Sequence, residues 1–208
     1  MMQTPTTTRR DIYTSFIDRL LRISDTRSHL SKVMAVMRSP SGTITAFLDD
    51  RAATPRQAFD FYATSFIYYV IGAALYTLAA RSSDDLAMFL SLVIGLIIVT
   101  LVLTALYEFF ARTSEVERRF NDHMIIYTLI LGSAVMLAAI GLVLGAIFAP
   151  IGVIIGAIAF VWGLVMLVLL FSRYWEIPLP TVALFTFGGG ILGAVLAGLI
   201  GFILVTLL

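Results

Sequence analysis

The sequence predicts an all-α fold: a polytopic membrane helical bundle with five transmembrane helices and an amphipathic N-terminal helix. The first observation behind this prediction is composition. The 208-residue chain is 60% hydrophobic and only 13% charged, and its mean hydropathy is +0.98, whereas soluble domains are about 45–50% apolar and about 25% charged. The second observation is that the apolar residues after residue 60 form runs that match the roughly 20 residues needed for one helical crossing.

The first 54 residues are predicted to lie outside the membrane. Residues 1–8 are polar, and we expect a disordered tail. Residues 9–54 are predicted to be a cytoplasmic amphipathic segment and connector, because apolar residues recur at three- and four-residue spacing up to residue 38. This helix would lie on an anionic membrane surface, pack on the bundle, or dock a partner helix. Its candidate partner or membrane-surface residues are Phe16, Leu20, Ile23, Leu30, Met34, Arg19 and Arg22.

Residues that end or begin helices separate this helix from the membrane domain, which is predicted over residues 55–208. Pro40 and Gly42 end the amphipathic helix. A second helix is predicted to start at Pro55, with Thr54 and Gln57 forming a capping box. This helix continues into the first crossing. The five predicted crossings, separated by polar or proline-containing segments, are 61–80, 86–107, 124–148, 151–172 and 181–207.

The third and fourth crossings come from a single uncharged run of 49 residues, Met124–Ser172. Phe148–Gly152 is the obvious place for this run to turn, so we expect a transmembrane hairpin. Small residues at four-residue spacing let membrane helices approach closely. Such stripes occur in the hairpin and again in the last crossing. The candidate helix-packing residues are Gly141, Gly145, Gly152, Gly156, Gly189, Gly193, Ala197 and Gly201.

The distribution of basic residues predicts the orientation. Thirteen of the 14 Lys and Arg residues fall in the segments on the N-terminal side of the membrane, and only Arg81 falls on the other side. Because basic residues concentrate in cytoplasmic segments, we expect a cytoplasmic N-terminus and a C-terminus on the opposite side.

Ionisable side chains inside membrane helices are candidate functional groups by default, but the predicted crossings carry none at mid-depth. The nearest lie at predicted cytoplasmic ends, where we expect a polar cluster of Asp60, Glu108, Asp122 and His123. Capping of the helix ends is the simpler interpretation of this cluster, and catalysis the alternative. With two histidines and no cysteine, the chain alone builds neither a zinc nor a haem site. We therefore expect a protein that is not an enzyme and has no cofactor.

Four stretches carry a resemblance to a known family: TPRQAFDFYATSFIYYV, FNDHMIIYTLI, APIG and SRYWEIPLPTVALFTF. With them the chain resembles the Yip1-domain membrane proteins, including bacterial members, over about residues 50–208. The Asp-Leu-Tyr-Gly-Pro type motif of the eukaryotic members is absent. The resemblance therefore implies a bacterial relative in the inner membrane, a five-helix protein without enzymatic activity that acts through helix and partner contacts.

These observations favour a non-catalytic membrane scaffold or accessory subunit of a membrane protein assembly. Its partners would be the lipid bilayer and other membrane subunits or a second copy of the chain. Nucleic acid is not expected, because the net charge is only +1. The alternative is a small channel or transporter with a neutral path between helices three to five. Lipid binding or curvature sensing by residues 9–38 is a third hypothesis.

Overall fold

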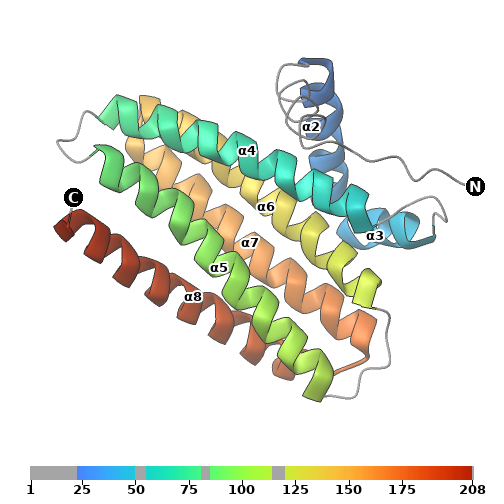
Figure 1. Cartoon of the computed structure of the whole chain (residues 1–208). Coiled ribbons are helices and arrows are strands. Elements are labelled where there is room, and N and C mark those ends of the chain that lie inside the picture. Colours follow the sequence, from blue (N-terminus) through green and yellow to red (C-terminus); the bar gives the residue numbers. More distant parts are fainter. Residues whose placement is uncertain (1–22, 50–54, 81–84, 114–119, 208) are drawn as a thin grey trace, which may run out of the picture.

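The computed structural model describes residues 23–49, 55–80, 85–113 and 120–207. Within these ranges the protein is all α, as the sequence predicts, with seven helices and no strand (Figure 1). Five of them, α4 to α8, are long and apolar enough to cross a membrane. The predicted tail at residues 1–8 lies outside the described part of the chain. The helices are α2 Ile23–Arg38, α3 Pro40–Asp49, α4 Pro55–Ala80, α5 Asp85–Thr113, α6 Phe120–Ile147, α7 Ala149–Trp175 and α8 Leu179–Leu207.

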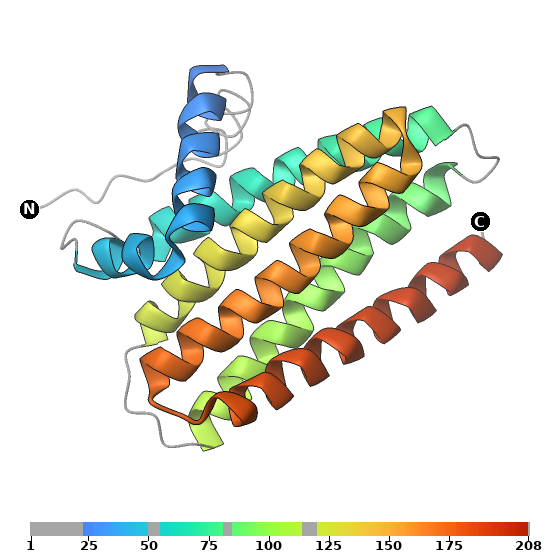
Figure 2. The same ribbon diagram turned by 180° about the vertical axis from the view of Figure 1, so that it is seen from behind.

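The long helices run antiparallel in two sets (Figures 1 and 2). In the first set α6 lies between α4 and α7 and packs along both; in the second, α5 packs along α8. The N-terminal end of the bundle is the end where α4, α6 and α8 begin; α5 and α7 begin at the opposite end. More than half of the central apolar stretch of α6 is buried, a larger share than in any of the other four. The bundle is therefore centred on α6.

A one-residue turn connects α6 and α7. Phe148 has an extended backbone, with φ −145° and ψ 98°, and Pro150 occupies the first turn of α7, where its missing N–H costs no helical hydrogen bond. The two helices then approach closely, since a Cβ placed on Gly152 would lie 2.9 Å from the carbonyl oxygen of Gly141. The run of 49 uncharged residues thus folds as the expected hairpin.

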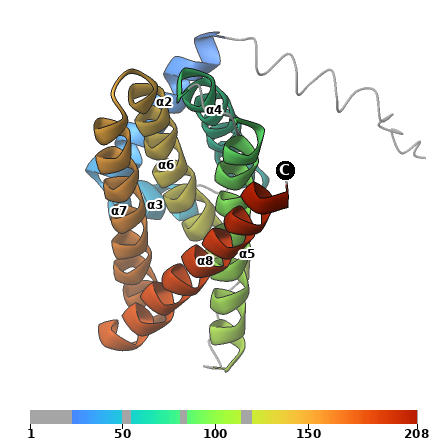
Figure 3. The same cartoon turned by 90° about the vertical axis from the view of Figure 1, so that its left-hand side faces the viewer.

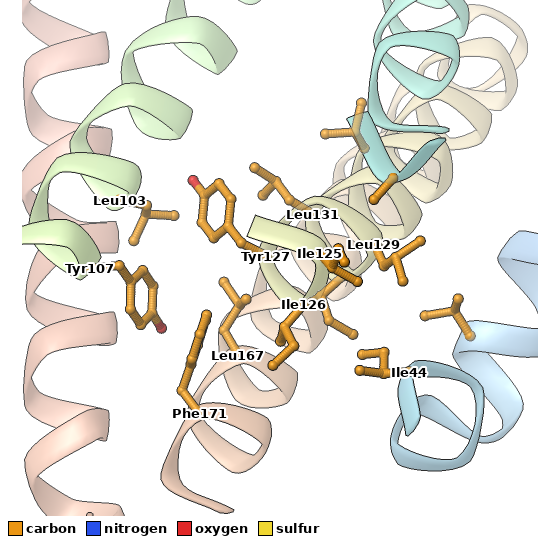
Figure 4. Close-up of a cluster of buried hydrophobic side chains, with 14 of the residues drawn as sticks. Ile44, Leu103, Tyr107, Ile125, Ile126, Tyr127, Leu129, Leu131, Leu167 and Phe171 are labelled. Atoms are coloured by element: carbon orange, nitrogen blue, oxygen red, sulfur yellow. The ribbon is translucent and has the colours of Figure 1, made fainter. Parts of the chain in front are cut away.

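The short helices α2 and α3 pack on the side of this bundle, against α6 (Figure 2). Ser39 separates them, and Pro40 then opens α3, since its fixed φ suits the first helical position. Ile44 of α3 is buried beside Ile125, Ile126 and Leu129 of α6 (Figure 4). The N-terminal helices therefore share the hydrophobic core of the membrane domain.

An aromatic cluster joins the two helix sets near the N-terminal end. Tyr107 of α5 and Phe171 of α7 have ring centroids 4.5 Å apart (Figure 4), and Trp175 lies 4.5 Å from Phe171. Phe110 continues the cluster towards Phe185 of α8, at 4.3 Å. Stacked and tilted ring pairs at these distances each add a modest stabilisation beyond the apolar area that they bury.

Candidate functional site

Helix α2 is held on the membrane domain by polar contacts, one of them buried and one part-buried. The Nε2 atom of His29 lies 2.9 Å from the Ser65 hydroxyl of α4. Phe61 lies next to the same imidazole, with ring centroids 4.7 Å apart. The hydroxyl of Thr26 hydrogen-bonds to that of Tyr68. His29 and Ser65 are both buried, so a polar pair fixes where α2 sits along α4.

The electrostatics of His29 favour a neutral ring. Burial, with a smaller contribution from the neighbouring Lys32 ammonium, lowers the pKa of His29 from 6.5 to about 4. A neutral imidazole has one nitrogen that donates and one that accepts, and either arrangement is compatible with the Ser65 hydroxyl. Protonation of His29 would place a charge among apolar rings, which is unfavourable.

The buried and exposed faces of α2 are distinct. His29, Val33 and Val36 form the buried face. The exposed face carries Arg27, Lys32 and Arg38, with Met34 46% exposed among them. Of the predicted surface residues, Leu30 is half-buried and Met34 faces outward. Ile23 is the first residue of α2. The remaining four lie outside the described residues: Phe16, Arg19, Leu20 and Arg22.

Three of the four residues of the predicted polar cluster contact side chains outside that cluster. Asp122 accepts a hydrogen bond from the Tyr174 hydroxyl at 2.8 Å. His123 accepts one from the Trp175 indole nitrogen, also at 2.8 Å. These contacts join the start of α6 to the end of α7. By contrast, Glu108 forms an ion pair with Arg112, one turn along α5, at 2.8 Å, and Asp60 lies on α4.

The small-residue stripe of α8 faces α5. A Cβ on Gly193 would lie 3.1 Å from Val99 Cα, and one on Gly189 only 2.5 Å from a methyl of Leu106. Ala197 contacts the Gly95 position, and Gly201 lies near Ser91. Gly141, Gly145 and Gly152 bring α6 and α7 together, whereas a Cβ on Gly156 would meet no atom within 4 Å.

Gly156 instead borders a cavity, here called the apolar groove, between the two helix sets. Its volume is about 490 Å³. All five membrane helices contribute to its lining, which is rich in small side chains and includes Ser91, Gly95, Ala134, Gly156, Ala159 and Ala194. Long tyrosine side chains cross the space between the helix sets. Tyr69 of α4 donates to the Leu92 carbonyl, and Tyr127 of α6 donates to the Thr100 carbonyl.

Neither the polar pair under α2 nor the groove was identified from the sequence. The spacing of His29, Val33 and Val36 is a helical-face signal that points to the buried side of α2. The groove gives no such signal, because small residues at helical spacing suit tight packing and an open space equally well.

No protein-family model, curated protein or solved structure matches the chain. The five apolar helices agree with the architecture implied by the Yip1-domain resemblance, but no family match supports that assignment. Among the described residues, no group of three or more His, Asp or Glu side chains is placed to hold a metal ion. The described part of the chain presents two surfaces for interaction: the basic outer face of α2 and the apolar groove.

Proposed function

We propose that the protein is a non-catalytic scaffold or accessory subunit of a membrane protein assembly. The observation that carries this proposal is the docking of α2, whose inner face is buried and whose outer face is basic. The outer face has Arg27, Met34 and Arg38 at positions i, i+7 and i+11, which lie on one side of a helix. An exposed apolar residue between two arginines suits an acidic, amphipathic partner surface.

Docking on the bundle prepares this surface for binding, because a free helix would first have to become ordered. An unattached helix of 16 residues is marginally stable in water, so it would have to order when it binds. The His29–Ser65 and Thr26–Tyr68 contacts order α2 in advance. Pre-organisation of this kind lowers the entropic cost of association.

The proposal includes a location and a topology. We place the chain in a bacterial inner membrane with α2 and α3 in the cytoplasm, because basic residues dominate the segments on that side. The five-helix, Yip1-like arrangement is part of the same proposal. The partner would then be a cytoplasmic or juxtamembrane part of another subunit.

Copurification from native membranes in mild detergent tests the proposal. We expect the wild-type chain to bring down a stoichiometric partner or a second copy of itself, and the R27E/R38E variant to lose it. Arg173, exposed at the end of α7, provides the matched control, since R173E changes charge by the same kind of substitution on a different helix. A lone wild-type monomer, or equal loss in R173E, would contradict the proposal.

A small channel or transporter remains a second candidate because the fold contains the apolar groove. The Ser91 hydroxyl donates to the Ala87 carbonyl at 2.7 Å, and Tyr69 donates to Leu92. The protons of both hydroxyls are therefore used by backbone carbonyls, so neither hydroxyl has a donor left for a hydrated solute. Flux of ions or small solutes into proteoliposomes under a gradient tests this candidate, and no flux is expected.

A further inference from the structure

The apolar groove has dimensions that distinguish between the possible occupants. Its lining extends from Gly152 to Leu167 on α7 and from Ser91 to Leu103 on α5. At 1.5 Å per helical residue, both stretches correspond to a length of about 20 Å. Dividing the volume of about 490 Å³ by this length gives a mean cross-section of about 25 Å².

This cross-section is too small for another helix. A helix with side chains is at least ~10 Å across and needs ~80 Å². A single file of methylene groups, with neighbouring carbons at ~4 Å, needs on the order of 16 Å². The groove therefore accommodates one hydrocarbon chain along its length, whereas a partner helix or a second copy of the bundle would fit only partly between its walls.

The chemistry of the lining leads to the same occupant. The side chains that line it are small or apolar apart from Tyr69 and Ser91, whose hydroxyls donate to backbone carbonyls. Among the described residues, no buried side-chain nitrogen or oxygen lacks a hydrogen-bond partner. A polar ligand would lose its hydration and find only these two hydroxyl oxygens as side-chain acceptors, which is costly, whereas a hydrocarbon chain has no hydrogen bonds to lose.

The groove is also accessible from the bilayer. Helix α8 touches α7 where Gly190 meets Leu164, and beyond this point the two helices diverge (Figure 3). Phe160 and Ala194 line the groove there and are both exposed. The aromatic cluster around Tyr107 and Phe171 lies beyond the other end, next to Leu103 and Leu167 (Figure 4). The groove is therefore open to the bilayer between the middle of the bundle and its opposite end, where α5 and α7 begin.

We propose that the apolar groove is a binding site for one acyl chain of a membrane lipid, which enters between α7 and α8 from the leaflet at the opposite end. None of the described residues that line the groove is charged, so the lining itself contributes no selectivity for the charge of the headgroup. This inference goes beyond the proposed scaffold function and does not depend on a protein partner.

Photolabelling tests the site. The probe is a phosphatidylcholine with a diazirine halfway along one acyl chain, incorporated into vesicles with the full-length protein. We expect label on groove residues of α5 and α7 in preference to the outward faces. Gly156 can be replaced without a clash, since a Cβ there meets nothing within 4 Å. The G156L variant should then lower groove labelling about tenfold. Gly198, also with open space at its Cβ and outside the groove, gives the matched control G198L, which should label like the wild type.

Two results would overturn the acyl-chain site. One is a label spread evenly over all exposed apolar faces. The other is unchanged groove labelling in a folded G156L variant. If G156L does not fold, A194L fills the groove from the α8 side instead. Unchanged groove labelling in a folded A194L variant would then overturn the site. These labelling experiments do not depend on copurification of a partner. A negative result would therefore contradict the acyl-chain site without contradicting the scaffold proposal.

Discussion

Gly152 of α7 lies directly against Gly145 of α6: a Cβ on Gly152 would lie 2.7 Å from the Gly145 Cα. This contact holds the hairpin together through backbone, with no flexible side chain that can move away. We therefore expect G152A to lower the free energy of unfolding by about 1–3 kcal/mol, the usual cost of overpacking. Thermal unfolding in detergent, followed by circular dichroism, measures the effect.

The matched control is G156A, one helical turn further along α7. Its Cβ would meet nothing within 4 Å, and alanine is favoured over glycine inside helices by about 1 kcal/mol. G156A should be neutral or slightly stabilising. Equal effects of the two substitutions would mean that helix propensity, and not the Gly145–Gly152 contact, sets the stability of the hairpin.

The hairpin also illustrates how much the sequence predicts. An uncharged run of 49 residues with one turn signal near Pro150 has few alternatives to two membrane helices, so the fold class and the five spans follow from composition and punctuation. Which helices pair with one another does not follow from these features. Gly152 and Gly193 have the same local pattern, yet one packs on the neighbouring helix in the chain and the other on α5.

The candidate sites were less predictable for a related reason. His29 contacts Ser65, 36 residues away, and no local pattern encodes a contact of that separation. The apolar groove depends on five helices, so it exists only once the bundle is assembled. Asp122 and His123 were expected at a helix end, but their partners, Tyr174 and Trp175, come from α7.

The pairing of α5 with α8 can be tested by cross-linking, because the chain contains no cysteine. A Cβ on Gly95 would lie 3.5 Å from the Ala197 Cβ, and disulfides require about 3.5–4.5 Å. The G95C/A197C variant should therefore form an intramolecular disulfide under mild oxidation, visible as a faster band on non-reducing gels.

The control for this cross-link shifts one cysteine by a single residue. Gly198 points into open space, so G95C/G198C should cross-link at least tenfold more slowly. Similar rates for the two pairs would contradict the α5–α8 register described here.

The docking of α2 should depend on pH through His29. Its pKa is lowered from 6.5 to about 4 in the docked state, so the folded protein binds fewer protons than the undocked one. The stabilisation is complete above pH 6.5 and is lost as the pH falls towards 4, by at most ~1.4 kcal/mol per pH unit. Amide hydrogen exchange of α2, measured at pH 7.5 and pH 5 and corrected for intrinsic rates, should show weaker protection at pH 5.

Replacing the imidazole separates this effect from general acid sensitivity. H29Q keeps a neutral hydrogen-bonding side chain near Ser65 but has no group that titrates in this range. We expect α2 in H29Q to be protected to the same degree at both pH values. A pH response that persists in H29Q would assign the effect to another group.

A hydrogen bond between the Tyr107 and Thr186 hydroxyls joins α5 to α8 inside the aromatic cluster. Thr186 is fully buried and donates to the Val182 carbonyl at 2.8 Å, so its oxygen accepts from Tyr107. T186V keeps the shape of the side chain but leaves the Tyr107 hydroxyl without this acceptor, at a cost of about 1–3 kcal/mol. Y107F removes the donor instead, and in the T186V background it should cost much less than it does alone. Unfolding free energies of the wild type, both single variants and the double variant give the coupling, and strictly additive effects would show that the two hydroxyls do not interact.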